Sequence, residues 1–140
     1  MSPGTKTATI RSIQKHDDEY DIAFEGDRVG LALKNITVKD LDRGTVLTNE
    51  PTIQSSKNLT ANVSLVKYWR SEIKEGMVLH IGHWMQFLNT KVESVQKREN
   101  DDLTIKLSSE KELVYKSGDE AVLMYLEGGK LRIVGTAQLN

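Results

Sequence analysis

The sequence has 140 residues, of which 38% are hydrophobic and 28% charged, with 19 basic side chains, 20 acidic side chains and no cysteine. This length and apolar content suit one domain or two small ones, and they exclude a disordered chain. The lack of cysteine excludes disulfides, iron-sulfur clusters and thiolate zinc sites, and a net charge of -1 restricts nucleic-acid binding to a local patch.

Membrane and export signals are missing from the sequence. No apolar run approaches the roughly 20 residues of a membrane-spanning helix, so we expect no membrane partner. The first residues, Met-Ser-Pro-Gly-Thr-Lys, lack the apolar stretch of a secretory signal. With no cysteine to suggest an oxidising compartment, the sequence predicts a cytoplasmic protein.

The beginning of the chain has the pattern of short strands. Residues 7–13 alternate as a half-buried strand does, and residues 28–34 repeat the pattern after a turn at Gly26, which can take the positive φ that the turn needs. The polar residues 14–19 predict a loop, where binding groups collect, although simple solvation also explains such a charged loop.

The next stretch predicts one helical turn and one short strand. Residues 37–43 place Val38 and Leu41 three apart, which suits a single helical turn that Gly44 ends. Residues 45–47 then predict a short strand.

Pro51 separates two groups of predicted strands, because proline cannot donate to a sheet ladder. We therefore expect a shorter domain over residues 1–50 and a longer one over residues 51–140. The longer domain has six candidate strands, at residues 59–66, 78–81, 90–95, 103–107, 121–126 and 130–137. Such strands predict an antiparallel barrel or sandwich, and Gly128 and Gly129 predict a hairpin turn between the last two. The expected fold class is all-β.

Catalytic and metal-binding patterns are not found in the sequence. The nearest fragment to a Walker loop is Gly128-Gly129-Lys130, which has no following hydroxyl residue and opens a strand. His80 and His83 fall on opposite faces of an extended strand, and further metal ligands are not nearby. No serine or threonine stands beside a histidine as a nucleophile beside its base. We expect no catalytic site, no metal and no cofactor, and we predict a protein that is not an enzyme and does not bind GTP by itself.

One segment alternates basic and aromatic side chains in the manner of RNA-binding surfaces. It comprises Lys67, Tyr68, Trp69 and Arg70, and Lys74 follows. Packing at the core and rim of a barrel is the alternative, since basic stems cover apolar surface while their charges stay in water.

Three segments in fixed order resemble part of domain II of the elongation factor Tu-like translational GTPases. They are residues 8–16, 23–34 and 40–47, which contain Gln-x-His, Ala-x-x-Gly-x-Arg-Val-Gly and Arg-Gly-x-x-Leu. The closest resemblance is to the archaeal selenocysteine-type elongation factors. The domain III barrel of the same family is resembled by residues 74–82, 117–123 and 131–135.

The resemblance implies two small antiparallel β-barrel units, the first of them partial. The GTPase domain and the first half of domain II, which the family places before Lys6, are not in this sequence. The resemblance implies a module that binds aminoacyl-tRNA or the ribosome, including ribosomal RNA, and that works with a separate GTPase domain. The candidate tRNA contacts are Gln14, His16, Asp17, Lys67, Trp69, Arg70 and Lys74; Gly26, Gly44, Gly128 and Gly129 are expected to be structural turns.

An alternative is a stand-alone β-barrel domain that binds a protein and no RNA. The net charge of -1 favours it, because a large tRNA footprint brings a basic excess. If residues 6–47 form only part of a barrel, their outer strands leave backbone groups unpaired, which predicts self-association through the open edge.

Overall fold

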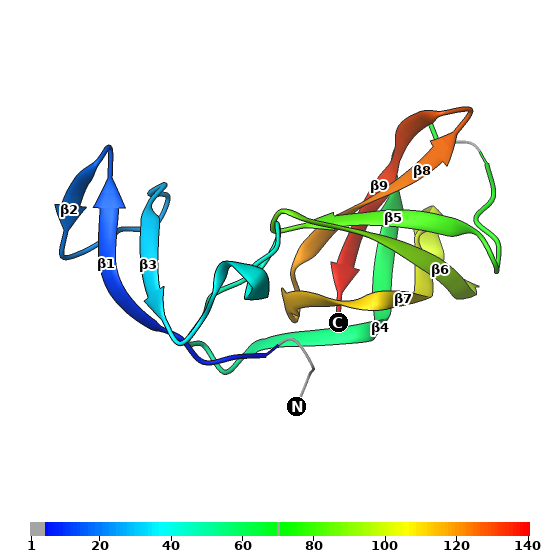
Figure 1. The fold of residues 1–140 in the computed structure, drawn as a ribbon. Helices are drawn as coiled ribbons and strands as arrows, with labels where there is room; N and C mark the ends of the chain where they lie inside the picture. The colour runs from blue at the N-terminus through cyan, green and yellow to red at the C-terminus, as the bar shows by residue number, and fades with distance from the viewer. Residues whose placement is uncertain (1–4, 70) are drawn as a thin grey trace. The chain divides into compact units, whose positions relative to one another are not determined.

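The computed structural model describes residues 5–69 and 71–140, and it confirms the all-β fold class. The chain forms two compact units, Met1–Asp42 and Arg43–Asn140, here called the sheet unit and the barrel unit. Figure 1 traces the strands of each unit. Compact units are not necessarily independent folding domains, so the domain boundary expected after residue 50 stays a prediction. Within the described ranges, no helix has the length and apolar content needed to cross a membrane.

The sheet unit is a three-stranded antiparallel sheet in the order β2-β1-β3. Its strands are β1 (Thr9–Lys15), β2 (Asp18–Tyr20) and β3 (Gly30–Lys34). A bulge in β1 brings both of its isoleucines to the face where they pair with β3 leucines. None of the residues described in this unit is fully buried. The unit therefore has one apolar face and no enclosed core.

A single turn of 3-10 helix, η1 (Val38–Asp40), follows the sheet, as the sequence predicts. The Asp40 carboxylate accepts hydrogen bonds from the Thr37 backbone N–H at 2.9 Å and from the Thr37 hydroxyl at 3.1 Å, and it also pairs with Lys6. These contacts hold the pKa of Asp40 down, from 3.8 to about 2, with the Lys6 hydrogen bond as the largest cause. The turn is thus fixed by local polar contacts.

Two expectations for the chain before residue 50 are wrong. Residues 45–47 run as irregular chain, because six other strands already close the barrel without them. The loop expected at residues 14–19 is a hairpin, since β2 folds back on β1 through a two-residue turn.

The barrel unit is a closed six-stranded antiparallel barrel in the order β4-β7-β6-β5-β8-β9 (Figure 1). Its strands are β4 (Ile53–Leu65), β5 (Val78–His83), β6 (Gln86–Lys97), β7 (Leu103–Lys116), β8 (Glu120–Glu127) and β9 (Lys130–Leu139), with a 3-10 turn η2 (Glu99–Asp101) before β7. All six predicted strands are present. The sequence left a barrel or a sandwich open, and the pairing of β4 with β9 makes it a barrel.

Alternating inward side chains fill the barrel. Leu79, Ile81, Ile105, Leu107 and Leu123 are among the side chains with at most 1% of their surface exposed. Burying each such side chain contributes about 1.5–3 kcal/mol relative to exposure. The barrel unit therefore has the enclosed apolar core that the sheet unit lacks.

Glycine is required in the barrel unit at a tight turn and at a close approach of two strands. Gly128 and Gly129 form the β8–β9 turn with φ of 56° and 79°. Gly135 lies where β9 crosses β4, and a Cβ on it would stand 2.1 Å from the Ser64 carbonyl oxygen. Only a residue without a side chain allows this close approach.

Candidate functional site

The hairpin tip between β1 and β2 brings together the three candidate contacts of the sheet unit. His16 and Asp17 form the turn with φ of 50° and 69°, and Gln14 is the second-last residue of β1. All three are exposed. Left-handed backbone at two successive non-glycine residues matches the twist of a two-residue hairpin but is strained. Trp84 and Met85 form a similar turn in the barrel unit, so the strain alone does not mark a site.

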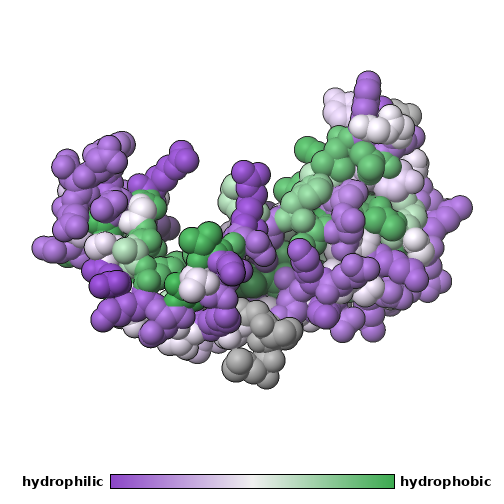
Figure 2. Space-filling view, in the orientation of Figure 1, coloured by the Kyte–Doolittle hydropathy of each residue, from purple (hydrophilic) through white to green (hydrophobic). Residues whose placement is uncertain are grey.

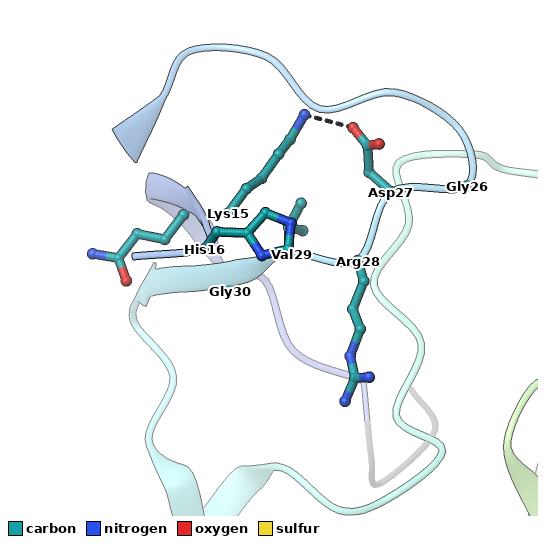
Figure 3. A pocket seen from close by; sticks show the side chains of 8 residues that line it. Lys15, His16, Gly26, Asp27, Arg28, Val29 and Gly30 are labelled. Carbon is teal, nitrogen blue, oxygen red and sulfur yellow. Dashed lines mark ion pairs between the residues drawn. The ribbon is translucent and has the colours of Figure 1, made fainter. Parts of the chain in front are cut away.

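An open hollow of about 560 Å³ lies beside this hairpin (Figure 3). One wall is formed by Gln14, Lys15 and His16, and the other by residues 26–30. The two walls are neighbours because Gln14 pairs with Gly30 in the antiparallel ladder of β1 and β3. The hairpin tip and the chain entering β3 therefore form one surface.

An ion pair fastens the second wall to the first. Lys15 Nζ lies 2.6 Å from Asp27 Oδ2, and that carboxylate also accepts the Phe24 backbone N–H at 2.8 Å. The Lys15 ammonium group stands 4.9 Å from the Tyr20 ring centroid and 5.6 Å from that of Phe24. The hydrogen bond from Lys15, and next that from the Phe24 backbone, lower the pKa of Asp27. Lys15 is thus engaged within the wall.

Arg28 is the exposed cation of the hollow. Its side chain extends away from the Lys15–Asp27 pair (Figure 3). The Arg28 guanidinium, the His16 ring and the Gln14 amide each carry hydrogen-bond donors for an anionic group. Asp17, in the hairpin turn next to His16, carries an acceptor. Among the residues that the structure describes, no three His, Asp or Glu side chains could hold a metal ion together. The arrangement suits binding by polar contacts.

The other candidates lie on the connection between β4 and β5. Lys67, Tyr68 and Lys74 are exposed, with 83% of the surface of Tyr68 accessible. Trp69 is half-buried against the core, edge-on to Tyr125 at 5.6 Å between ring centroids. Arg70 lies outside the described residues. The Trp69 ring therefore packs against the barrel core, which is the alternative to RNA contact that the sequence left open. RNA contact by this segment stays a prediction.

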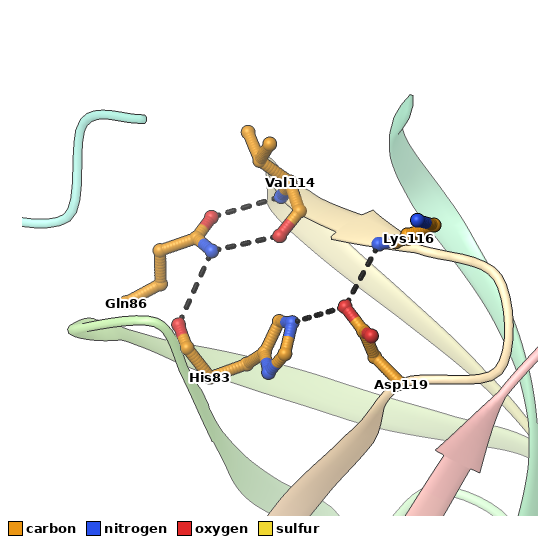
Figure 4. A network of polar contacts seen from close by, with 5 residues as sticks. All are labelled: His83, Gln86, Val114, Lys116 and Asp119. Atoms are coloured by element: carbon orange, nitrogen blue, oxygen red, sulfur yellow. Dashed lines mark hydrogen bonds and ion pairs between the residues drawn. The ribbon is translucent and has the colours of Figure 1, made fainter. Parts of the chain in front are cut away.

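A cluster of polar side chains at one end of the barrel makes hydrogen bonds to backbone groups (Figure 4). The Gln86 amide donates to the Val114 carbonyl and accepts the Val114 N–H, both at 2.8 Å, beyond the point where the β6–β7 ladder ends. His83 Nε2 lies 3.0 Å from Asp119 Oδ2, which also accepts the Lys116 N–H at 3.0 Å. These hydrogen bonds hold the ends of the barrel strands in place. His80 lies on the opposite face of β5 from His83, as the strand spacing predicts.

Lys15, Asp27 and Arg28 were not among the candidate contacts predicted from the sequence. Arg28 and Asp27 come beside Gln14 only through the β1–β3 register. A signal was present: Arg28 begins the strand predicted over residues 28–34, and antiparallel pairing with residues 7–13 brings the start of that strand to the end of the first.

Sequence comparison finds relatives along nearly all of the chain. No protein-family model matches it. Over 98% of its length the chain is 38% identical to an uncharacterised protein of Methanocaldococcus jannaschii, covering 42% of that protein. Over 97% it is 32% identical to elongation factor 1-alpha of Plasmodium falciparum, covering 30% of it. The oocyte form of elongation factor 1-alpha from Xenopus laevis is 27% identical. The chain spans less than half the length of the first two relatives.

Structure comparison finds the same fold in translation elongation factor SelB of Methanococcus maripaludis. Its apo form matches 99% of this chain with a TM-score of 0.82 and 19% identity, and the match covers 35% of that chain. The same protein in complex with the GTP analogue GppNHp gives an equal score. At this identity the match shows the fold alone. Together with the sequence relatives, it confirms the resemblance to the elongation factor Tu-like translational GTPases across the two β units.

Proposed function

We propose that the chain is an elongation factor-like module that binds aminoacyl-tRNA, with the ribosome as its second partner in translation. The observation that carries the proposal is the 32% identity to an elongation factor 1-alpha over 97% of the chain. Because the chain covers only 30% of that relative, the proposal concerns RNA binding and extends to no further activity of the larger protein.

The proposal is supported by polar groups of the hollow and of the hairpin turn beside it, whose chemistry suits an aminoacylated tRNA end. That end carries phosphates and a positively charged α-amino group. His16 and Arg28 can donate hydrogen bonds to phosphate oxygens, and Asp17 can accept from the ammonium group. The hairpin also carries Asp18 and Glu19, which repel a bare phosphate backbone. We therefore propose that the aminoacyl group contributes to recognition and that uncharged tRNA binds more weakly.

GTP binding is not part of the proposed activity. The sequence contains no Walker loop, so we propose that any GTP-dependent step belongs to a separate GTPase domain and that this chain is not itself an enzyme. Calorimetric titration of the chain with GTP and Mg²⁺ checks this point. Micromolar binding would contradict it.

A second candidate function is protein binding by the barrel without RNA. The observation that favours it is a group of exposed hydrophobic side chains on the outside of the barrel unit, including Phe87, Leu126 and Ile133, each more than half exposed. Binding to aminoacyl-tRNA separates the two candidates, because only the first requires it.

The test measures anisotropy of labelled aminoacyl-tRNA, with deacylated tRNA and ribosomal subunits as further ligands. We expect the charged tRNA to bind more tightly than the uncharged one. Arg28→Ala should weaken binding about tenfold, since a hydrogen bond to a charged group contributes about 1.5–3 kcal/mol. Lys97→Ala, which removes an exposed cation from the barrel unit, is the matched control and should change little. A chain that does not bind charged tRNA would contradict the proposal, whether or not it binds ribosomal subunits.

A further inference from the structure

The outer face of the barrel carries apolar side chains on the neighbouring strands β8 and β9 and at the start of β6. We call this group the outer patch, and it comprises Phe87, Val122, Met124, Leu126, Leu131 and Ile133. Figure 2 shows hydrophobic side chains gathered on this part of the barrel unit, over β8 and β9. Five of the six expose between 39% and 58% of their surface, and Met124 is half-buried.

The strand register makes the outer patch continuous. Gly82 of β5 pairs with Phe87 on one side and with Val122 on the other. Along β8 and β9, Met124 pairs with Ile133. Leu126 then pairs with Leu131. Residues directly opposite on antiparallel strands have Cβ atoms about 5 Å apart, so the two pairs on β8 and β9 are in contact. Phe87 and Val122 lie on either side of Gly82, and the Met124 methyl group fills part of the space above that glycine.

The outer patch is held in shape before any partner binds. The His80 ring stacks flat on the Phe87 ring, with centroids 5.2 Å apart and planes 4° from parallel. The buried Nδ1 of His80 has no hydrogen-bond partner, so stacking sets the position of the ring. A Cβ on Gly82 would lie 3.2 Å from the Met124 methyl carbon, so the missing side chain makes room for Met124. A surface ordered in advance loses less conformational entropy on binding.

The charges of this face suit a second copy of the same chain. None of the six side chains of the outer patch is charged, so two copies can meet there without facing like charges. At the hairpin end, Arg132 Nε lies 3.5 Å from Glu127 Oε2, which neutralises both groups at the rim. The net charge of the whole chain, -1, adds almost no long-range repulsion between copies.

We propose that the outer patch joins two copies of the chain face to face about a two-fold axis. A two-fold interface places the same surface of each copy against the other, and an uncharged apolar face meets no like charge in its own copy. Monomeric proteins rarely expose contiguous apolar patches larger than a few hundred Å², and larger ones mark interaction sites. The dimer is independent of the RNA binding that we propose for the sheet unit.

Sedimentation velocity of the full chain over about 1 to 500 μM, a range that detects micromolar dissociation constants, tests the proposal. We expect a concentration-dependent dimer. Ile133→Glu, which buries a charge at the centre of the interface, should raise the dissociation constant at least about 100-fold, equivalent to about 2.8 kcal/mol. Val38→Glu is the matched control: Val38 is 87% exposed in the sheet unit, and the dimer should remain.

A second variant keeps the test valid if Ile133→Glu disturbs the fold. The chain has no cysteine, so Ile133→Cys introduces a single thiol, which a short bismaleimide should link into a dimer faster than the thiol of Val38→Cys. Three outcomes overturn the proposal: a monomer at every concentration, a dimer that survives Ile133→Glu unchanged, and equal cross-linking of the two cysteine variants. A dimer that survives Ile133→Glu unchanged would point instead to association through the open edge of the sheet unit.

Discussion

The two units of the chain are stabilised in opposite ways. Every buried hydrophobic residue of the described chain lies in the barrel unit, where strands distant in sequence enclose a dry core. In the sheet unit, Ile10, Tyr20 and Phe24 remain 54%, 45% and 71% exposed. The order of the sheet unit rests on its ladders, the Lys15–Asp27 pair and the polar contacts of η1.

This difference separates the scaffold from the candidate site. Binding regions commonly lie in the less stable parts of a protein, which open locally and can become ordered when a ligand binds. The hollow beside the β1–β2 hairpin lies in the sheet unit, whereas the outer patch lies on the rigid barrel. We therefore expect RNA binding to change the order of the sheet unit and dimerisation to leave the barrel fold unchanged.

The largest expected difference is in the free energy of unfolding lost when one apolar side chain of each unit is truncated to alanine. Leu123→Ala removes a fully buried side chain from the barrel and should cost about 3–5 kcal/mol, as cavities in packed cores do. Ile13→Ala, in the sheet unit, should cost under about 1 kcal/mol because Ile13 is only half-buried. Urea unfolding followed by tryptophan fluorescence measures the cost in the barrel unit, which holds both tryptophans, and the amide NMR signals of β1 measure it in the sheet unit. Equal costs would contradict the comparison.

Two glycines of the barrel test how closely its strands approach. Gly135→Ala sets a Cβ against the Ser64 backbone and should cost about 1–3 kcal/mol, the usual range for overpacking. Gly82→Ala is the matched control, since its Cβ meets only the flexible end of Met124, and it should cost less. The midpoints of urea unfolding measure both. A more harmful change at Gly82 would refute the close approach of β9 to β4.

Gln86 allows a test of the polar end of the barrel. Gln86→Ala leaves the Val114 N–H and carbonyl without their side-chain partner and should cost about 1–3 kcal/mol, the penalty for unpaired buried groups. Gln96→Ala, at an exposed position of the same strand, should be nearly neutral. Thermal unfolding compares the two variants. An equal, small effect would show that water replaces the Gln86 amide.

The smallest effect is the pH dependence that Asp40 gives to the sheet unit. The pKa of Asp40 is lowered to about 2 in the folded chain, so the stability it contributes is present above its ordinary pKa of 3.8 and is lost as the pH falls through about 2. NMR titration should show the Asp40 carboxyl protonating near pH 2 together with loss of the η1 turn. Asp40→Asn should abolish that step. A midpoint near 3.8 would contradict the contacts with Lys6 and Thr37.

The barrel was largely predictable from the sequence, and the sheet unit only partly so. Barrel strands such as residues 121–126 alternate strongly because one side faces a core. β2 escaped prediction because Asp-Glu-Tyr is exposed on both sides, and its hairpin uses His16 and Asp17 where glycine or asparagine is usual.

The candidate site shows the same limit. Gln14, His16 and Asp17 were found together because they are neighbours in sequence. Arg28 joins them only through the pairing of β1 with β3, which local patterns do not specify. The outer patch likewise depends on the register of β5, β8 and β9, and its residues appear in the sequence as ordinary strand positions.

Residue-resolved amide hydrogen exchange on the full chain, with and without aminoacyl-tRNA, tests the central claim most directly. The account predicts that core amides such as those of Leu79, Leu107 and Leu123 exchange only by global unfolding, with or without tRNA. Amides of β1 and β2 should exchange by local opening in the free chain and slow down when aminoacyl-tRNA binds. Equal protection of both units in the free chain, or protection by tRNA that spares the β1–β2 hairpin, would contradict it.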